Sequence, residues 1–291
     1  MTAFGIQGSG QLVGGAPDPG VFREVAVRAE ELGYDSIWAG DHISYRNPIL
    51  DVVVALSTFA AVTERITLGA GIVLLPLRHP SVVAKEFASL DYLSGGRTIL
   101  GVGVGGESAP DFDAVGISPH ERGARTDDAM RALRALFSER PASYEGRFFS
   151  FAGISIEPPP AQAGGPPLWV GGRSKAARRR AATLGDGWIP IWVSAERFAD
   201  GLAELPAQVT PAVTLPAHVG DPLALYEHLR VRYSGDFSEH VVDRYCVAGT
   251  PEHCVARVRE YIDAGAQHVV FNILELEDAD RLMEVARAAA G

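Results

Sequence analysis

An aspartate and a histidine stand side by side in the segment GYDSIWAGDHI, directly after a short apolar run at residues 36–40. Ionisable side chains avoid buried strands unless something pairs with them, so Asp41 and His42 are candidate functional residues. A histidine titrates near neutral pH and can give or take a proton during a reaction. The alternative is a surface pair that caps the following helix, and the residues alone leave both interpretations open.

A glycine turn precedes a basic helical pattern, KAARRRAATLG, in the middle of the chain. The turn consists of Gly171, Gly172, Arg173 and Ser174. Free backbone N–H groups at a helix start, together with nearby cations, form an anion site. Ser174 can cap the helix or donate a hydrogen bond to a phosphate. We therefore predict that this turn binds a phosphate, whereas for residues 178–180 we favour a solvated basic helix face.

Two more glycine-rich segments follow predicted strands. Gly69 and Gly71 suggest either the close approach of a ligand or close helix–strand packing. The run GVGVGG at residues 101–106 formally matches the dinucleotide-binding pattern GxGxxG. That pattern should open a helix, and here it leads into a segment that contains Pro110 and is predicted to be a loop. We therefore reject a dinucleotide fingerprint, although Gly105 and Gly106 would let the backbone pass close to a flat ring.

The predicted elements alternate between short apolar strands and amphipathic helices. The strands are apolar throughout, as parallel strands buried on both faces should be, and the alternation indicates βαβ units. A doubly wound sheet also satisfies this pattern, but eight units in one stretch favour an α/β fold of the TIM-like (β/α)₈ barrel type, whose active site lies at the carboxyl ends of the strands. The predicted strands are 4–8, 36–40, 66–72, 98–104, 168–170, 188–192, 213–219 and 268–273.

Some segments interrupt this rhythm. Residues 141–167 contain two aromatic-rich runs and several prolines, and we predict a hairpin inserted before the fifth strand. Residues 107–120 are predicted to be a long loop, and residues 195–244 have mixed periodicity. No linker marks a second domain, so the prediction is a single domain over residues 1–291.

Composition excludes several classes of protein. The formal net charge of −10 over 291 residues argues against nucleic-acid and anionic-membrane binding, which rely on a positive field. No apolar stretch is long enough to span a membrane, and the N-terminal residues do not form a signal peptide. The two cysteines, Cys246 and Cys254, do not form a CxxC motif or a disulfide framework, which favours a reducing cytoplasm. No HExxH or similar metal-binding spacing is present, so no metal is expected.

Several separated blocks occur in an order that resembles a known superfamily. The blocks are GYDSIWAGDHI, TERITLGAGIVLLPLRHP, LDYLSGGRTILGVGVGGE, ERGARTDDAMRALRALF and PPLWVGGRSKAARRRAATLGDGWIP. Together they resemble the luciferase-like monooxygenases, and most of all the branch that depends on coenzyme F420. The resemblance covers about residues 20–192, with GTPEHCVARVREYIDAGAQHVVFN near the end also similar.

The resemblance implies a barrel with an insertion before the fifth strand, and usually a homodimer. It implies that Asp41 and His42 lie beside the deazaflavin ring of F420, with His42 as the proton-transfer residue and Asp41 fixing the cofactor or the imidazole. It places a bulge with a non-prolyl cis peptide at Gly71 and Ile72, behind the ring. It also places the cofactor phosphate at the turn of residues 171–174.

Departures from the family limit what can be carried over. Sugar-phosphate dehydrogenases of this branch have an acidic glutamate where Gly106 stands here, with Glu107 one position later. A tryptophan of those enzymes is absent, since Ser44-Tyr45-Arg46 occupies that stretch. The predicted function is therefore hydride transfer between F420 and a small organic substrate. The alternatives are an FMN-dependent monooxygenase that uses oxygen and a barrel that binds a cofactor without catalysis.

Overall fold

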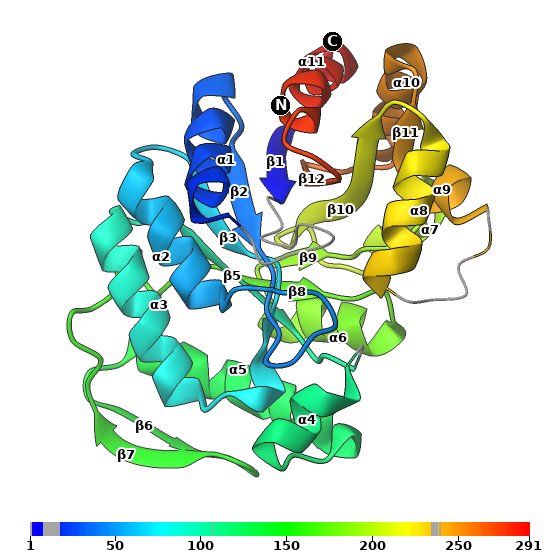
Figure 1. Cartoon of the computed structure of the whole chain (residues 1–291). Helices are drawn as coiled ribbons and strands as arrows, with labels where there is room; N and C mark the ends of the chain where they lie inside the picture. The colour runs from blue at the N-terminus through cyan, green and yellow to red at the C-terminus, as the bar shows by residue number, and fades with distance from the viewer. Residues whose placement is uncertain (1, 8–17, 107, 234–237, 239) are drawn as a thin grey trace.

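A closed ring of parallel strands forms the centre of the protein (Figure 1). The computed structural model describes residues 2–7, 18–106, 108–233, 238 and 240–291. Each strand pairs in parallel with the next, and β12 pairs with β1 to close the ring. This confirms the predicted (β/α)₈ barrel. In ring order the strands are β1 (Ala3–Gln7), β2 (Ser36–Ala39), β3 (Thr67–Ala70), β5 (Thr98–Gly103), β8 (Leu168–Gly171), β9 (Gly187–Ile189), β10 (Thr210–Val219) and β12 (His268–Ile273).

Helices surround this ring, and local sequence signals set their ends. The first helix begins after Asp18, whose carboxylate accepts N–H bonds from Gly20 and Val21, and it ends at Gly33 in the left-handed conformation. None of the helices in the described ranges is long and apolar enough to cross a bilayer. The principal helices are α1 (Pro19–Leu32), α2 (Val52–Val62), α3 (Pro80–Ser94), α5 (Arg122–Ser138), α6 (Lys175–Leu184), α7 (Ala195–Leu202), α8 (Pro222–Tyr233), α9 (His240–Tyr245), α10 (Pro251–Asp263) and α11 (Asp278–Ala290).

Large side chains fill the inside of the barrel below its mouth. Trp38 of β2 and Trp169 of β8 pack with their ring centroids 5.4 Å apart. His268 of β12 lies edge-on to both rings, and its Nε2 is 2.7 Å from the Ser36 hydroxyl. Burial lowers the pKa of His268 to about 4, so this ring is a neutral part of the core at neutral pH.

The segment inserted before the fifth barrel strand forms an antiparallel hairpin, β6 (Ala142–Glu145) and β7 (Ser150–Ile154), as predicted. The hairpin lies outside the barrel beside α3 and α5 (Figure 1). One carboxylate, Asp128 of α5, anchors it by accepting hydrogen bonds from the Tyr144 hydroxyl and from the N–H groups of Phe148 and Phe149.

Two sequence predictions need correction. Residues 107–120 are not one long loop, because α4 (Ala109–Val115) and the 3₁₀ turn Pro119–Glu121 form there. Pro110 occupies the first turn of α4. Backbone N–H groups in the first turn have no partner within the helix, so a proline there costs no hydrogen bond and is compatible with the start of a helix. The third strand is not continuous over residues 66–72, because it breaks after Ala70 and resumes as β4 (Val73–Leu74).

Candidate active site

The predicted site residues follow the carboxyl ends of four neighbouring barrel strands. Asp41 and His42 come after β2, and Gly105 and Gly106 come after β5. The other residues lie between β3 and β4 or at the end of β8, and they are Gly71, Ile72, Gly171, Gly172, Arg173 and Ser174. Because these strands are adjacent and parallel, the structure brings all of these residues to one rim of the barrel.

The imidazole of His42 is held by a carboxylate that the sequence analysis did not single out. Nδ1 of His42 lies 2.8 Å from Oδ2 of Asp111, which is in the first turn of α4. The backbone N–H groups of Ile43 and Ser44 donate to the other oxygen of Asp111 at 2.9 and 2.8 Å. The Asp111 side chain is 1% exposed and that of His42 is 12% exposed. Asp111 thus fixes both the ring and the loop that carries it, and leaves Nε2 of His42 as the ring nitrogen available for proton transfer.

Asp41 is engaged on the other side of the loop. Its carboxylate accepts hydrogen bonds from the Leu74 N–H and from the guanidinium of Arg78, which also pairs with Asp51 at 2.7 Å. Burial opposes the charge on Arg78, but the two carboxylates raise the pKa of its guanidinium above the ordinary value. Of the two roles predicted for Asp41, fixing the imidazole is therefore wrong, because Asp111 does this. Asp41 instead ties the β2 loop to β4.

The bulge between β3 and β4 contains the predicted non-prolyl cis peptide, which joins Gly71 and Ile72. The carbonyl of Gly71 accepts a hydrogen bond from the Gln7 amide at 3.1 Å. The side chain of Ile72 enters the barrel mouth, where a Cβ added at Gly103 would lie 1.7 Å from its Cδ1 and one at Gly171 would lie 2.9 Å from it. These glycines therefore make room for Ile72.

The other glycine of the third strand is explained by packing. A Cβ at Gly69 would lie 2.2 Å from the Trp38 ring. Gly69 thus packs against a side chain of the neighbouring strand inside the barrel, and the predicted close packing against a helix is not what the structure shows.

The turn after β8 has the geometry of a phosphate site. Ser174 caps α6 by accepting the N–H of Ala177 at 3.1 Å, and Gly172 has a φ of 100°, which a glycine adopts without strain. A cavity of about 500 Å³ opens beside this turn and is lined by Arg173, Ser174 and Arg178 among others. Because Arg178 pairs with Glu204 of the same cavity, the features that fit a phosphate are the helix start, the glycine turn and Arg173.

A second cavity, of about 710 Å³, adjoins the first. Both are lined by Arg173 and Trp192. Tyr45 lines the second cavity, and its ring stacks on that of His42 with centroids 4.1 Å apart. The predicted phosphate turn and the ring stacked on His42 therefore line two neighbouring cavities, which together suit an elongated cofactor with a flat ring at one end.

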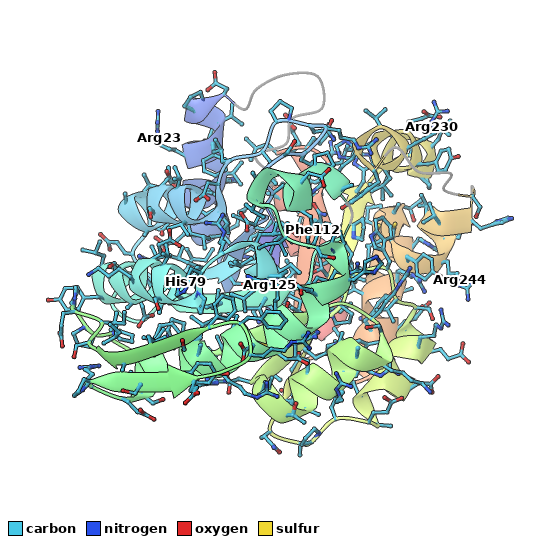
Figure 2. All side chains as sticks on the ribbon, turned by 90° about the horizontal axis from the view of Figure 1, so that it is seen from below. Arg23, His79, Phe112, Arg125, Arg230 and Arg244 are labelled. Carbon is cyan, nitrogen blue, oxygen red and sulfur yellow. The ribbon has the colours of Figure 1, made fainter. Side chains whose placement is uncertain are left out.

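The helix α4 closes one side of this rim. Figure 2 shows Phe112 of α4 near the middle of the face seen from below. Phe112 is 1% exposed and packs with Leu74 and Leu77 of the bulge region, while a Cβ at Gly105 would lie 3.4 Å from its ring. Glu107, whose role the sequence left in doubt, lies outside the described residues.

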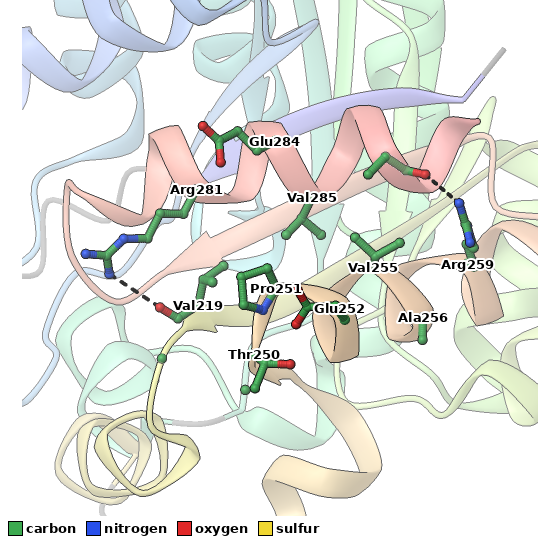
Figure 3. Close-up of a pocket in the computed structure, with 13 residues that line it drawn as sticks. Val219, Thr250, Pro251, Glu252, Val255, Ala256, Arg259, Arg281, Glu284 and Val285 are labelled. Carbon is green, nitrogen blue, oxygen red and sulfur yellow. Dashed lines mark hydrogen bonds between the residues drawn. The ribbon is translucent and has the colours of Figure 1, made fainter.

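A further cavity, of about 890 Å³, lies between α10 and α11 and contains none of the predicted site residues (Figure 3). Arg281 and Arg259 at its edges donate hydrogen bonds to the carbonyls of Val219 and Ala288. Both guanidinium groups are thus engaged by the protein itself.

Comparison with known proteins identifies the family. The sequence profile named luciferase-like monooxygenase matches residues 2–234. The chain belongs to the luciferase-like monooxygenase family. This confirms the resemblance noted in the sequence. Among curated members, an F420-dependent glucose-6-phosphate dehydrogenase from Kineococcus radiotolerans is 28% identical, covering 87% of each chain. A 5,10-methylenetetrahydromethanopterin reductase from Methanolobus tindarius is 26% identical, covering 84% of this chain and 87% of that one.

Solved structures support the same fold for this luciferase-like protein. An F420-dependent secondary alcohol dehydrogenase, solved with an F420–acetone adduct, superposes with a TM-score of 0.83 at 21% identity and covers 99% of both chains. The monooxygenase RslO1 from Streptomyces bottropensis superposes with a TM-score of 0.82 at 23% identity and covers 97% of both. At these identities the likeness establishes the barrel and leaves the chemistry to be argued from the site.

Proposed function

We propose that this protein is an F420-dependent oxidoreductase that acts on a small organic substrate. The observation that carries the proposal is the convergence of the His42–Asp111 pair, the Gly71–Ile72 bulge and the phosphate turn on one rim of the barrel. The names of the curated relatives support F420 as the cofactor. When bound, the deazaflavin supplies hydride-transfer chemistry, which no amino-acid side chain provides.

Each part of the rim has a role in this proposal. The turn of residues 171–174 binds the phosphate through backbone N–H groups and the Ser174 hydroxyl. The side chains of Ile72 and Leu74 present an apolar surface to one face of the ring. Asp111 orients His42, and Nε2 of His42 gives or takes the proton that accompanies the hydride. Tyr45 stacks on one face of the His42 ring and helps to hold its orientation.

Replacement of His42 by alanine tests the proton-transfer role. We expect turnover with F420 to fall by about 10²–10⁴-fold, the usual contribution of a positioned acid or base, while F420 still binds. The matched control is His120→Ala, because His120 is exposed on the 3₁₀ turn and its side chain makes no hydrogen bond to a predicted site residue among the described residues. Unchanged turnover in the His42 variant would show that the assignment is wrong.

The choice of cofactor is tested separately, by titrating the purified protein with F420 and with FMN and following tryptophan fluorescence. We expect F420 to bind more tightly, with Ser174→Ala weakening the binding. Binding of FMN alone would overturn the proposal in favour of an oxygen-using monooxygenase. Tight binding of F420 with no turnover on a broad substrate panel would favour a barrel without catalysis.

We also propose that the protein is a homodimer in which α2 and α3 form the contact. These neighbouring helices carry large apolar side chains that water would otherwise surround, since Val54 is 59%, Val82 53% and Leu93 80% exposed. Exposed apolar patches on a folded protein usually mark an interaction surface.

A further inference from the structure

Arg232 carries a buried positive charge that no carboxylate of the described residues neutralises. The residue lies near the end of α8 and is 6% exposed. Its Nη1 donates to Oδ1 of Asn272 at 3.0 Å, and its Nε is buried without a hydrogen-bond partner. No ion pair of Arg232 is found among the described residues. Because a guanidinium stays charged in proteins and buried charges are almost always paired, this arrangement is costly without a ligand.

The partner of the guanidinium, Asn272, lies near the carboxyl end of β12, at the same end of the barrel as the predicted site residues. His268 and Val270 of β12 face the barrel interior, so Asn272, two residues further along the strand, faces the same way. Asn272 is also the register partner of Gln7, whose amide donates to the carbonyl of Gly71 in the bulge. The chain of contacts from Arg232 through Asn272 and its strand neighbour Gln7 thus reaches Gly71 of the bulge.

Two other described groups near Arg232, Tyr233 and His228, do not compensate its charge. The Tyr233 ring lies 5.4 Å from Cζ of Arg232 and offers a neutral face. His228 is on the same helix, and burial and then the charges of Arg232 and His218 lower its pKa to about 4. His228 is therefore neutral at pH 7, and its buried Nε2 also has no hydrogen-bond partner.

The backbone of Arg232 ties the same spot to the loop that carries His42. Its carbonyl accepts hydrogen bonds from the Tyr45 hydroxyl at 3.3 Å and from the Asn47 amide at 3.1 Å. The ring of Tyr45 stacks on His42. The backbone of Arg232 is therefore held beside the loop that carries His42.

We propose that Arg232 binds an anionic group of the substrate, a carboxylate or a phosphate-like oxyanion, through its Nε–H and Nη2–H edge. These two donors are parallel and match two oxygens of such a group, and neither makes a hydrogen bond within the described residues. The inference rests on the proposed function, because the reacting atoms of that substrate must reach His42. It narrows the substrate class to organic acids or their phosphate counterparts.

The test is a nuclear magnetic resonance titration of protein labelled with ¹⁵N-arginine, with the Nε–H resonances assigned through bonds. The probes are acetate and its neutral isostere acetamide. We expect acetate, but not acetamide, to move the Arg232 Nε–H resonance in a saturable way. The internal control is Arg230, which is on the same helix, paired with Glu227, and at the edge of the molecule in Figure 2. No movement for Arg232, or equal movement with both probes, would overturn the inference.

A second arm separates the substrate from the cofactor as the source of the anion. The acetate titration is repeated in the presence of saturating F420, whose binding is followed independently. We expect acetate to keep moving the Arg232 resonance. If F420 alone moves that resonance and abolishes the acetate response, the anion belongs to the cofactor and the substrate assignment is overturned. If F420 does not bind at all, the proposed function fails. The acetate response of Arg232 is still tested by the first titration, which contains no F420.

A third arm measures the unfolding temperature. Replacing an arginine that only supports the fold would lower this temperature, whereas replacing one that carries an uncompensated charge would not. We expect Arg232→Met to unfold at a temperature equal to or above that of the parent protein, because the uncompensated charge is gone, and to lose all stabilisation by acetate. Arg230→Met should leave the acetate response unchanged. A marked loss of stability in Arg232→Met, together with an unchanged acetate response, would show that Arg232 only supports the fold.

Discussion

At the scale of single residues, the chemistry of the site depends on partners that are far apart in the sequence. His42 was predicted from its position after an apolar strand, but Asp111 lies 69 residues later. No local pattern links the two, and only the side-by-side arrangement of β2, β3 and β5 in the sheet brings α4 against the β2 loop. The one sequence signal for Asp111 is an acidic residue in a helical turn that starts with a proline, which becomes informative once Pro110 is recognised as a helix start.

Replacing Asp111 by asparagine should reverse the hydrogen bond to His42. An asparagine oxygen can still accept the N–H groups of Ile43 and Ser44, but its amide then donates to Nδ1 and leaves the proton on Nε2. We expect kcat to fall by about 10²–10⁴-fold with little change in F420 affinity, as for other wrong-tautomer variants. Asp113→Asn, an exposed change on the same helix, is the control. Equal kcat values in both variants would contradict the role of Asp111.

The buried His268 makes a prediction about pH. Its folded pKa of about 4 is below the ordinary value of 6.5, so the unfolded chain binds a proton first as the pH falls. Stability linked to this ring is therefore complete above about pH 6.5 and is lost between 6.5 and about 4. The free energy of unfolding is measured in urea at pH 7.5 and at pH 4.5. We expect it to fall less on acidification in His268→Gln than in the parent protein, by up to about 3 kcal/mol. The control is the exposed His120→Gln. If the free energy of unfolding fell by the same amount on acidification in both variants, the buried imidazole would not be its cause.

At the scale of elements, the sequence predicted most of the barrel because parallel strands buried on both faces are apolar throughout. The strands that were found and the inserted hairpin follow from that pattern. The errors came where one residue was interpreted without its neighbours. Pro110 was taken to exclude a helix, and the apolar run ending at Ile72 hid a break in the third strand. Residues 195–244 were hard to interpret because α8 has no regular apolar stripe and β10 contains two prolines.

The break in the third strand predicts how β5 tolerates added side chains at Gly101 and Gly103. A Cβ at Gly101 would meet the carbonyl oxygen of Ala70 at 2.0 Å, whereas one at Gly103 would meet the flexible end of Ile72. Gly103→Ala should cost about 1–3 kcal/mol, and adding Ile72→Ala should restore much of it. Gly101→Ala should cost more, and the same second change should not restore it, because backbone cannot move aside. Urea unfolding of these single and double variants measures both couplings.

At the scale of the whole molecule, the apolar faces of α2 and α3 predict an association. We expect the protein to sediment as a dimer, and Val54→Asp with Val82→Asp to convert it to a monomer, because burying two carboxylates in an apolar contact is costly. The control is Leu223→Asp, which changes an exposed apolar side chain on α8 instead. Sedimentation of the parent protein as a monomer would exclude this proposal without affecting the site.

The inserted hairpin has a consequence for the order in which the molecule opens. Burial opposes the charge of Asp128, but hydrogen bonds from Tyr144, Phe148 and Phe149 hold the pKa of its carboxyl below the ordinary value. Because several donors of the hairpin bond to this one carboxylate, we expect the hairpin to detach from α5 as a single unit when these bonds break. Deuterium should therefore reach the amides of residues 142–154 together, and much sooner in Asp128→Asn, while the amides of the barrel strands keep their protection.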